Sequence, residues 1–486
     1  MQTKNYQAAL LWAIPPLLAC TGSPPPVDNA VGTEFAAKSN AVEVGQEEAS
    51  ATSLGIRRGQ AREFGAPPTI QTGPFPEEVA EALDTAFGDN LAEWKWDEEE
   101  LAALGTLLES GDVRLAWAFT DLIRVSPDRE LSSLLILIAS ELMGPDFELE
   151  DDWGVITDHL IAWDIPAPPG YVDLKRRIYS PLVPQWESII QPGQVDWRLV
   201  TWGGVRIDDR AYDTTDEPCN CIPAIDNPET QPAAEATWLK DSDIVFGIVV
   251  GDAARAYPRR IMEVREMVND TLGGRDLAIP YCTLCASAQA FFTDQLPEGV
   301  ERPILRTSGL LSRSNKVMYD VRTYSVFDTF LGTALTGPLA TKDLTLPQTG
   351  VVTTTFGEWK AKYPDTDVLV ESLALGRDFD FRNGRDADGP IFPIGDVDDR
   401  LAVQEDILGI VASSGTPVAF HVTTALETLR EGGSVAFENV RVVLDGGGLR
   451  AVDSAGEDLG GHQAFWFAWS QFYPDTELWP DLLDAK

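Results

Sequence analysis

The stretch LAIPYCTLCASAQAFF, residues Leu277–Phe292, sets two cysteines between two short apolar runs. The runs have the composition of β-strands, so the stretch predicts a strand, a tight turn and a second strand. Cys282 and Cys285 are separated by two residues, and a turn of that size lets their sulfurs face one another. The pair can act as a redox-active dithiol, bind one soft metal ion or form a plain structural disulfide, and the sequence leaves these alternatives open.

Length and composition indicate a folded, acidic protein. The chain has 486 residues, 44% of them hydrophobic, with 14 Trp and 20 Phe. That is enough apolar material for about two to four domains. Its 37 Lys and Arg against 77 Asp and Glu give a net charge of −40. Because phosphate contacts need clustered positive charge, we expect no nucleic-acid partner.

The N-terminal segment, residues 1–20, resembles the signal peptide of a bacterial lipoprotein. Lys4 supplies the basic end, an apolar run follows, and Leu17–Cys20 reads LLAC. The resemblance implies that Cys20 carries acyl chains and becomes the first residue of the mature protein. We therefore expect a membrane partner through this lipid anchor. Thr21, which follows the cysteine, favours an outer-membrane location facing the periplasm or the exterior.

Three kinds of sequence follow along the chain. Residues 21–72 are rich in Pro, Ala, Gly, Ser and Glu without apolar periodicity, which predicts a disordered tether. Residues 73–190 have apolar positions at spacings of three and four, which predicts a small α-helical domain with a surface for a protein partner. Residues 197–480 have short β-branched and aromatic runs between Gly, Pro and Asp. The predicted fold class is therefore α+β, with a β-rich mixed domain after the helices.

Part of the β-rich region reads as an internal duplication. The segments that begin FGIVVGD at Phe246 and LGIVASS at Leu408 each contain a Gly-Ile-Val strand, a turn, a second strand, a helical stretch and a closing strand. The pattern predicts repeat halves at residues 197–400 and 401–480, of which the second lacks cysteines.

Four cysteines remain once Cys20 is set aside. Cys219 and Cys221 are separated by one residue, and direct pairing would close a small strained ring, so we expect them to cross-pair with Cys282 and Cys285. Alternatively, four thiolates could bind zinc, and fewer could hold copper. Too few cysteines are present for a disulfide scaffold in a chain of this size, which leaves redox or metal roles in view.

The three histidines differ in context. His159 lies in a helical pattern and His421 at the end of a predicted strand, so both are expected to be structural. His462 follows Gly460 and Gly461 and precedes an aromatic run. A flexible turn there could bring it to the cysteines as a base or a ligand, or it could cap the turn.

Several stretches are similar to a bacterial family catalogued as domain of unknown function 3179. The similarity covers about Trp197 to Leu478 and rests on IPAIDNP from Ile222, ARAYPRRIMEVREMVNDTLGG from Ala254, the cysteine stretch, TSGLLSRSNKVMYD from Thr307, TGPLA from Thr336, and GHQAFWFAWSQFYPDTEL from Gly461. The resemblance brings no established reaction, although relatives labelled as possible selenoproteins would favour thiol redox chemistry.

This chain departs from the family pattern at two places. Relatives commonly read Trp-His-Glu where Val264, Arg265 and Glu266 stand, so a histidine that could be a ligand or base is absent. Relatives often have Cys-Pro-x-Cys-Gly where Thr283 and Ala286 stand, which weakens a zinc-ribbon interpretation.

The resembling motifs also carry polar residues that could line one pocket, although buried arginine–aspartate pairs would look the same in sequence. These residues are Arg255, Arg265, Arg313, Asn315, Tyr319 and Asp320.

The leading hypothesis is an extracytoplasmic lipoprotein with a thiol-redox or metal centre at Cys282 and Cys285. In the redox version Cys282 is the more exposed, attacking sulfur, and Arg265 or His462 lowers a thiol pKa. The alternative is a non-catalytic binding or scaffold lipoprotein whose cysteines form structural disulfides. No Walker loop, Rossmann glycine fingerprint or GxSxG motif supports another enzyme class.

Overall fold

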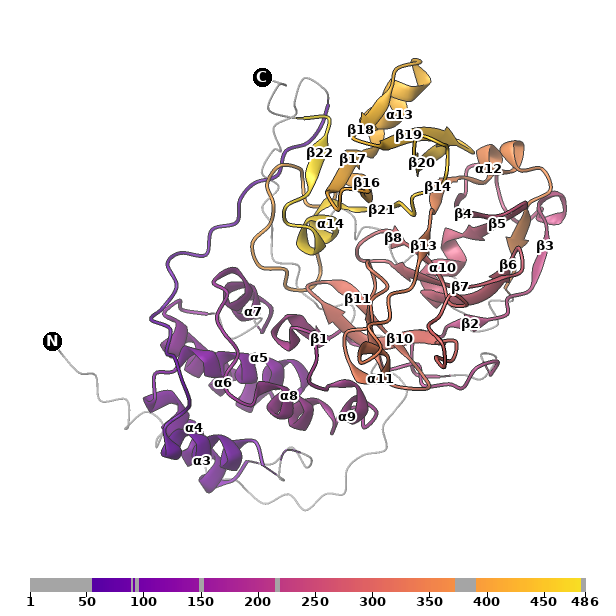
Figure 1. The fold of residues 1–486 in the computed structure, drawn as a ribbon. Coiled ribbons are helices and arrows are strands. Elements are labelled where there is room, and N and C mark those ends of the chain that lie inside the picture. Colours follow the sequence, from indigo (N-terminus) through magenta and orange to yellow (C-terminus); the bar gives the residue numbers. More distant parts are fainter. Residues whose placement is uncertain are drawn as a thin grey trace. The chain divides into compact units, whose positions relative to one another are not determined.

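The structure is a computed structural model that describes residues 55–88, 91, 96–147, 153–214, 219–371 and 390–481 (Figure 1). All of these residues belong to one unit of the chain, Ser39–Lys486. The predicted signal peptide, the lipidation site Cys20 and residues 21–54 of the predicted tether lie outside the described residues.

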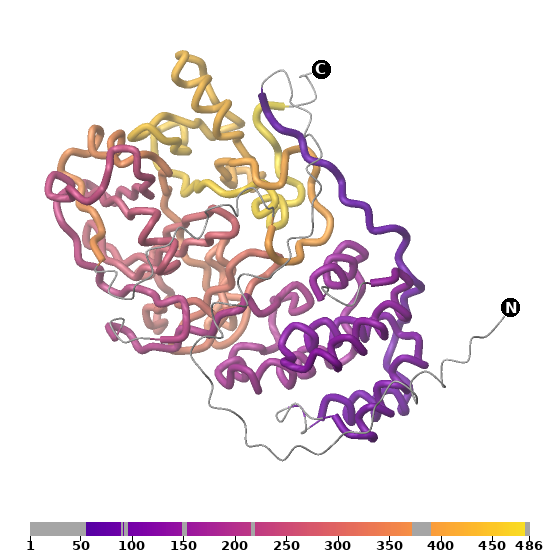
Figure 2. The backbone as a smooth tube through the Cα atoms, turned by 180° about the vertical axis from the view of Figure 1, so that it is seen from behind, coloured from indigo at the N-terminus to yellow at the C-terminus, as the bar shows by residue number. Residues whose placement is uncertain are grey.

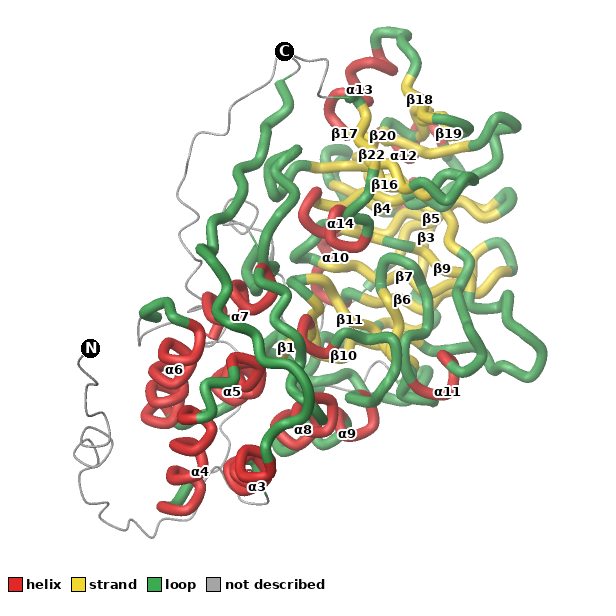
Figure 3. Tube along the Cα trace, turned by 60° about the vertical axis from the view of Figure 1, so that its left-hand side comes forward, coloured by secondary structure: helices red, strands yellow, loops and turns green. Residues whose placement is uncertain are grey.

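Helices dominate the N-terminal part and strands the rest (Figure 3). The N-terminal helices are α3 (Glu77–Ala86), α4 (Glu98–Glu109), α5 (Ala116–Val125), α6 (Arg129–Met143), α7 (Trp153–Ala162), α8 (Tyr171–Tyr179) and α9 (Trp186–Ile189). Two of these helices, α4 and α6, begin at a capping aspartate. The Asp97 side chain accepts from the backbone of α4 in a capping box with Glu100, and Asp128 caps α6 in a similar way.

The described strands form five separate small sheets of three to six strands. In sheet order, the first contains β1 (Val200–Trp202), β10 (Leu305–Ser312), β11 (Asn315–Asp320) and β12 (Val326–Asp328). The second contains β13 (Gln348–Thr349), β9 (Ala290–Phe292), β7 (Arg275–Cys282), β6 (Met267–Leu272) and β2 (Ile225–Asp226), with β8 (Ser287–Ala288) paired to β7. The third contains β14 (Val352–Thr355), β4 (Ile244–Val250), β5 (Ala253–Pro258), β15 (Asp367–Leu369) and β3 (Thr230–Pro232).

The last two sheets lie towards the C-terminus in sequence. The fourth contains β21 (His462–Phe465), β16 (Asp406–Val411), β17 (Pro417–His421) and β22 (Glu477–Trp479), and the fifth contains β18 (Val435–Phe437), β19 (Val440–Asp445) and β20 (Gly448–Val452). Short helices connect strands of the β-rich part: α10 (Arg259–Arg265), α11 (Gly337–Ala340), α12 (Phe356–Lys362), α13 (Val422–Arg430) and α14 (Trp466–Phe472).

The predicted fold class is wrong in two respects. The β-rich part is a set of five small sheets and not one mixed domain built from two repeat halves. The helices are a minor N-terminal part and not a separate small domain, because their apolar cluster continues into the first sheet through Val200, Leu310 and Val317. Sequence periodicity identified many of the elements, but it carries no information on which strands pair or on which faces share a core.

The third and fourth sheets each bury a tryptophan against a strand glycine. Trp359 of α12 covers Gly247 in β4, and Trp469 of α14 covers Gly409 in β16, so that a Cβ on either glycine would overlap the indole ring. In both sheets the helix leads into a strand that pairs parallel to a neighbour, β15 with β5 and β22 with β17. The glycines are therefore required for the helices to pack on these sheets.

The last part of the predicted tether differs from the prediction of disorder. Ile56 is fully buried, the backbone N–H of Gly59 donates to Asp399 O at 3.1 Å, and the Arg57 side chain donates to Glu405. Arg62 binds both carboxylate oxygens of Asp158 in α7. This segment therefore packs along the fold before the helices begin (Figure 2). Among the described residues, no helix combines the length and the apolar character needed to cross a membrane.

Replacing Gly409 by Ala should destabilise the fold by about 3 kcal/mol, because the added methyl group overpacks a site filled by Trp469. Gly105→Ala in α4 is the matched control, since no atom lies within 4 Å of its Cβ position and alanine favours a helix by about 1 kcal/mol. Urea unfolding of both variants measures the difference. Equal stability of the two variants would contradict this account of the packing.

Candidate thiol site

The first cysteine turn is closed on itself by a disulfide between Cys219 and Cys221. Cys219 is half-buried and Cys221 is 3% exposed. The segment is held by a backbone bridge between Cys221 and Arg206, and by the Thr307 hydroxyl, which donates to Ile222 O at 2.8 Å. The expected cross-pairing with the second cysteine pair is therefore not what the structure has.

A buried carboxylate lies beside this disulfide. One oxygen of Asp208 and the sulfurs of Cys219 and Cys221 all lie within 4.8 Å of one another. The Asp208 side chain is fully buried and accepts from Arg210 Nε and Nη2, each at 2.7 Å, and from Ala224 N at 2.8 Å. These donors already occupy lone pairs that a metal ion would need, so the trio is poorly suited to bind a metal in this arrangement.

A second buried ion pair extends this cluster. Arg306 in β10 donates to Asp226 in β2 at 2.8 and 2.5 Å, and its Nε lies 3.8 Å from Asp208. The side-chain amide of Asn269 donates to Asp226 at 2.9 Å. Two carboxylates and two guanidinium groups thus balance in charge, which is the condition under which buried ions are tolerated.

The second cysteine turn connects β7 to β8 and is closed by a disulfide between Cys282 and Cys285. Cys282 is 2% exposed and Cys285 is fully buried. Both belong to an apolar cluster that includes Trp466 and Trp469, and the N–H of Phe465 donates to Cys285 O at 2.9 Å. Cys282 was predicted to be the more exposed, attacking sulfur; it is 2% exposed against 0% for Cys285, because the turn packs into an aromatic core.

A buried lysine connects the surroundings of the two turns. Lys316 Nζ donates to the backbone oxygen of Glu266 at 2.9 Å and to its carboxylate at 3.0 Å, and Thr283, inside the second turn, donates to the same carboxylate at 3.1 Å. Burial lowers the pKa of Lys316, while the negative charges of Glu266 and, more weakly, Asp208 oppose that shift. Lys316 therefore interacts with both carboxylates, one beside each cysteine turn.

The four sulfurs do not form one metal site. Among the described residues, only Asp208, Cys219 and Cys221 bring three ligand atoms of the Cys, His or carboxylate type within 4.8 Å of one another. His462 therefore does not complete a three-ligand group with Cys282 and Cys285. The tentative zinc or copper site made of all four cysteines has no counterpart in this geometry.

His462 is buried in an aromatic environment. Its Nδ1 lies 2.9 Å from the Gln348 side-chain amide, and its ring packs edge-on against Phe330 and Trp469. Burial lowers the pKa of His462 to about 3, so the ring is neutral at physiological pH. Its Nε2 has no hydrogen-bond partner among the described residues.

The other two histidines are structural, as expected. His159 Nδ1 lies 2.8 Å from Val155 O within α7, and His421 lies between Glu405 and Thr424 with both ring nitrogens bonded.

The residues predicted to line one pocket are dispersed into separate contacts. Arg255 binds Asp270, and Arg265 binds Glu371 and Pro223 O. Arg313 and Asn315 both bind Gln471. Asp320 accepts from Ile304 N and Thr323, and the Tyr319 hydroxyl donates to Asp208 O at 2.7 Å. Of these, Tyr319 directly contacts the residue beside the first disulfide. Buried arginine–carboxylate pairing, the alternative interpretation, accounts for Arg255 and Arg265.

Sequence reasoning missed Asp208, Asp226, Arg306 and Lys316. One signal was available for Lys316 and Arg306, since each is a charged residue inside a run that otherwise reads as a buried strand. A charge at such a position predicts a buried partner. The partner itself could not be identified, because Asp226 is 80 residues from Arg306 in sequence.

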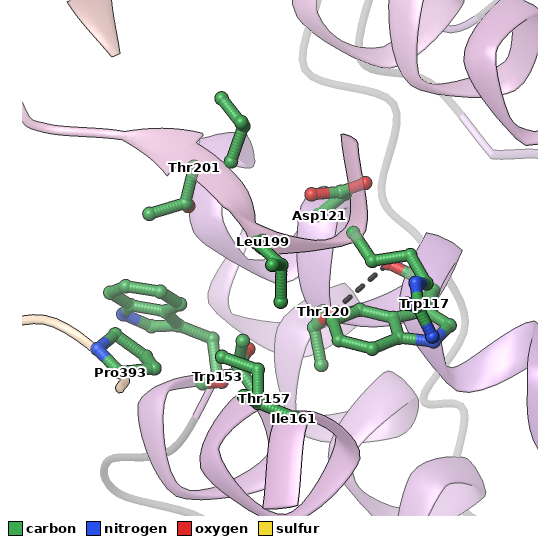
Figure 4. Close-up of a pocket in the computed structure, with 11 residues that line it drawn as sticks. Trp117, Thr120, Asp121, Trp153, Thr157, Ile161, Leu199, Thr201 and Pro393 are labelled. Carbon is green, nitrogen blue, oxygen red and sulfur yellow. Dashed lines mark hydrogen bonds between the residues drawn. The ribbon is translucent and has the colours of Figure 1, made fainter. Parts of the chain in front are cut away.

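The described cavities lie away from the cysteine chemistry. A cavity of about 10 Å³ is lined by Trp117, Thr120 and Asp121 of the helical part, by Thr201 of β1 and by Pro393. Figure 4 shows these side chains. That volume holds about one water molecule. A shallower groove of about 330 Å³ runs past Pro168 and Pro192. No cysteine lines either one.

The fold and the site define a β-rich protein with two disulfide-closed cysteine turns, one beside a buried charge network and one in an aromatic core. Residues 219–460 match the family described as "Protein of unknown function (DUF3179)". The chain belongs to this family, and the matched region begins at the first cysteine turn and includes the second. No curated protein and no solved structure matches the chain.

The buried His462 should make the fold sensitive to acid. An unfolded histidine takes up a proton near pH 6.5, whereas the native pKa of His462 is about 3, so stability falls as pH decreases through that window. The loss between pH 6 and pH 4 should be about 2 kcal/mol. His462→Gln should unfold with a shallower acid dependence, measured by urea titration from pH 4 to pH 8. Parallel pH profiles of the variant and the unmodified protein would contradict this assignment.

Proposed function

We propose that the protein is a lipid-anchored protein of the cell envelope that exchanges disulfides through Cys219 and Cys221. The observation that carries the proposal is accessibility. Cys219 is half-buried, whereas Cys221, Cys282 and Cys285 are 3% exposed or less. Thiol–disulfide exchange requires an incoming thiolate to reach a sulfur, so Cys219 is the sulfur that a partner can attack.

The reaction needs a partner that supplies two thiols. The partner's thiolate attacks the Cys219 sulfur, a mixed disulfide forms, and Cys221 leaves as a thiolate that takes up a proton. The partner's second thiol then loses its proton and attacks the partner's own sulfur in that mixed disulfide, which releases Cys219. The partner is oxidised to a disulfide and the Cys219–Cys221 pair is reduced by the same two electrons. The reverse sequence oxidises the pair.

The cellular setting of the proposal comes from the sequence. The lipoprotein-like segment ending at Cys20 supports anchoring to an outer membrane, on the periplasmic or exterior side. Disulfides persist in such an oxidising compartment. In this setting the Cys282–Cys285 pair acts as a buried staple between β7 and β8.

A non-catalytic scaffold is the second candidate, and the burial of Cys282 and Cys285 favours it for that pair. Under this alternative both disulfides are structural, and the exposed faces of the helices bind a protein partner. The two candidates differ in whether Cys219–Cys221 can be reduced while the protein stays folded.

Graded reduction separates the candidates. The folded protein is treated with a low concentration of dithiothreitol, labelled with maleimide and read by peptide mass analysis. Cys219 and Cys221 should be labelled at a lower dithiothreitol concentration than Cys282 and Cys285, because attack requires access of the reductant to a sulfur. The double variants Cys219→Ser/Cys221→Ser and Cys282→Ser/Cys285→Ser are matched controls, of which the first should abolish the early labelling. Reduction of neither pair before unfolding would favour the scaffold, and earlier reduction of Cys282–Cys285 would contradict the assignment.

The lipid anchor has its own test. The full chain expressed in a bacterial host should partition into the detergent phase of Triton X-114 and carry the added mass of acyl chains on the Cys20 peptide. Cys20→Ser should partition into the aqueous phase with an unchanged cysteine-turn labelling pattern. Aqueous partitioning of the unmodified chain would overturn the proposed anchor.

A further inference from the structure

We infer that Asp208 is a positioning residue for the Cys219–Cys221 pair, whose carboxylate holds the reduced sulfurs in the protonated form and so suppresses their attack near neutral pH. The inference rests on the proposed exchange function and deepens it by naming the group that sets the reactivity of the reduced pair.

The geometry places this carboxylate close to both sulfurs. One Asp208 oxygen and both sulfurs lie within 4.8 Å of one another, and the side chain is fully buried. At that distance and away from water, a negative charge disfavours a second negative charge strongly. A thiol can instead donate a weak hydrogen bond to the carboxylate, which favours the protonated sulfur.

The positive groups around Asp208 balance the carboxylates of the network and leave no positive charge to stabilise a thiolate. Arg210 directs Nε and Nη2 at Asp208, and Arg306 directs both terminal nitrogens at Asp226. Lys316 is bonded to Glu266, although it also feels the charge of Asp208. The Tyr319 hydroxyl donates to the backbone oxygen of Asp208. Arg210, Arg306 and Lys316 are each paired with a carboxylate, and this network carries no surplus positive charge for a thiolate.

This effect favours the disulfide form of the pair over the reduced form. A reduced pair held as thiols attacks a partner disulfide slowly until the pH rises, and Cys221 leaves the disulfide poorly because its thiolate is disfavoured. The disulfide is therefore the resting form, and the reduced pair requires a dithiol reductant to supply its electrons.

The test is the pH dependence of alkylation in the reduced protein. The full chain is reduced chemically, treated with iodoacetamide from pH 6 to pH 10, and read at Cys219 and Cys221 by peptide mass analysis. A synthetic peptide of residues 219–224 is the reference thiol. We expect the rate in the folded protein at pH 7.5 to be about tenfold below that of the peptide, with a midpoint above the ordinary thiol value of about 8.5. A midpoint at or below the peptide's would overturn the inference.

Two matched variants separate electrostatics from simple shielding. Asp208→Asn should raise the alkylation rate at pH 7.5 by about tenfold and lower the midpoint. Asp226→Asn removes the same charge from the same network without altering the carboxylate beside the sulfurs, and it should have a much smaller effect. Equal effects of the two variants would overturn the inference.

If Asp208→Asn fails to fold, the pH profile of alkylation in the unmodified protein still tests the inference. Failure of the proposed function has a separate signature, which is resistance of the Cys219–Cys221 disulfide to native reduction in the preceding labelling experiment.

Discussion

The buried charge network of Asp208, Arg210, Asp226 and Arg306 is the constraint on which the β-rich part depends. Arg306 lies in the first sheet and Asp226 in the second, so their forked ion pair joins two sheets that share no strand. Charges this deeply buried are tolerated only when fully paired. Removing one member leaves its partner uncompensated at a cost of about 3–5 kcal/mol. The network also fixes the segment that follows the first cysteine turn, because Ala224 N and O are bonded to Asp208 and Arg210.

The helical part depends on the β-rich part in a similar way. Its apolar cluster includes residues of the first sheet, and Asp158 in α7 accepts from Arg62 and from the backbone N–H groups of Ile394 and Gly395. A segment before the helices and a segment near residue 395 thus converge on one carboxylate. The helices therefore share their core and these hydrogen bonds with the rest of the fold and do not form an independent module.

The sequence allowed some of this to be predicted, and the reasons for the failures are physical. The strand–turn–strand around Cys282 was predicted, because local composition determines it. The burial of that turn was not, because it depends on Trp466 and Trp469, which are remote in sequence. Ring strain argued against direct pairing of Cys219 and Cys221, yet tertiary contacts through Arg206 and Thr307 hold that turn closed. The fold class failed for the same reason, since alternation reveals strands but not the sheets into which they pair.

The two cysteine turns differ in what surrounds their sulfurs, and the proposal of different roles for the two pairs rests on that difference. An aromatic core disfavours any charged sulfur and excludes attacking thiolates, so Cys282 and Cys285 are stable as a disulfide. The Cys219 turn faces a polar network that can exchange hydrogen bonds with a thiol, and one of its sulfur-bearing residues reaches solvent. Lys316 is hydrogen-bonded to Glu266 beside the second turn, and the negative charge of Asp208 beside the first turn weakly raises its pKa. Exchange at one pair with the other left intact, as proposed, requires two such different environments.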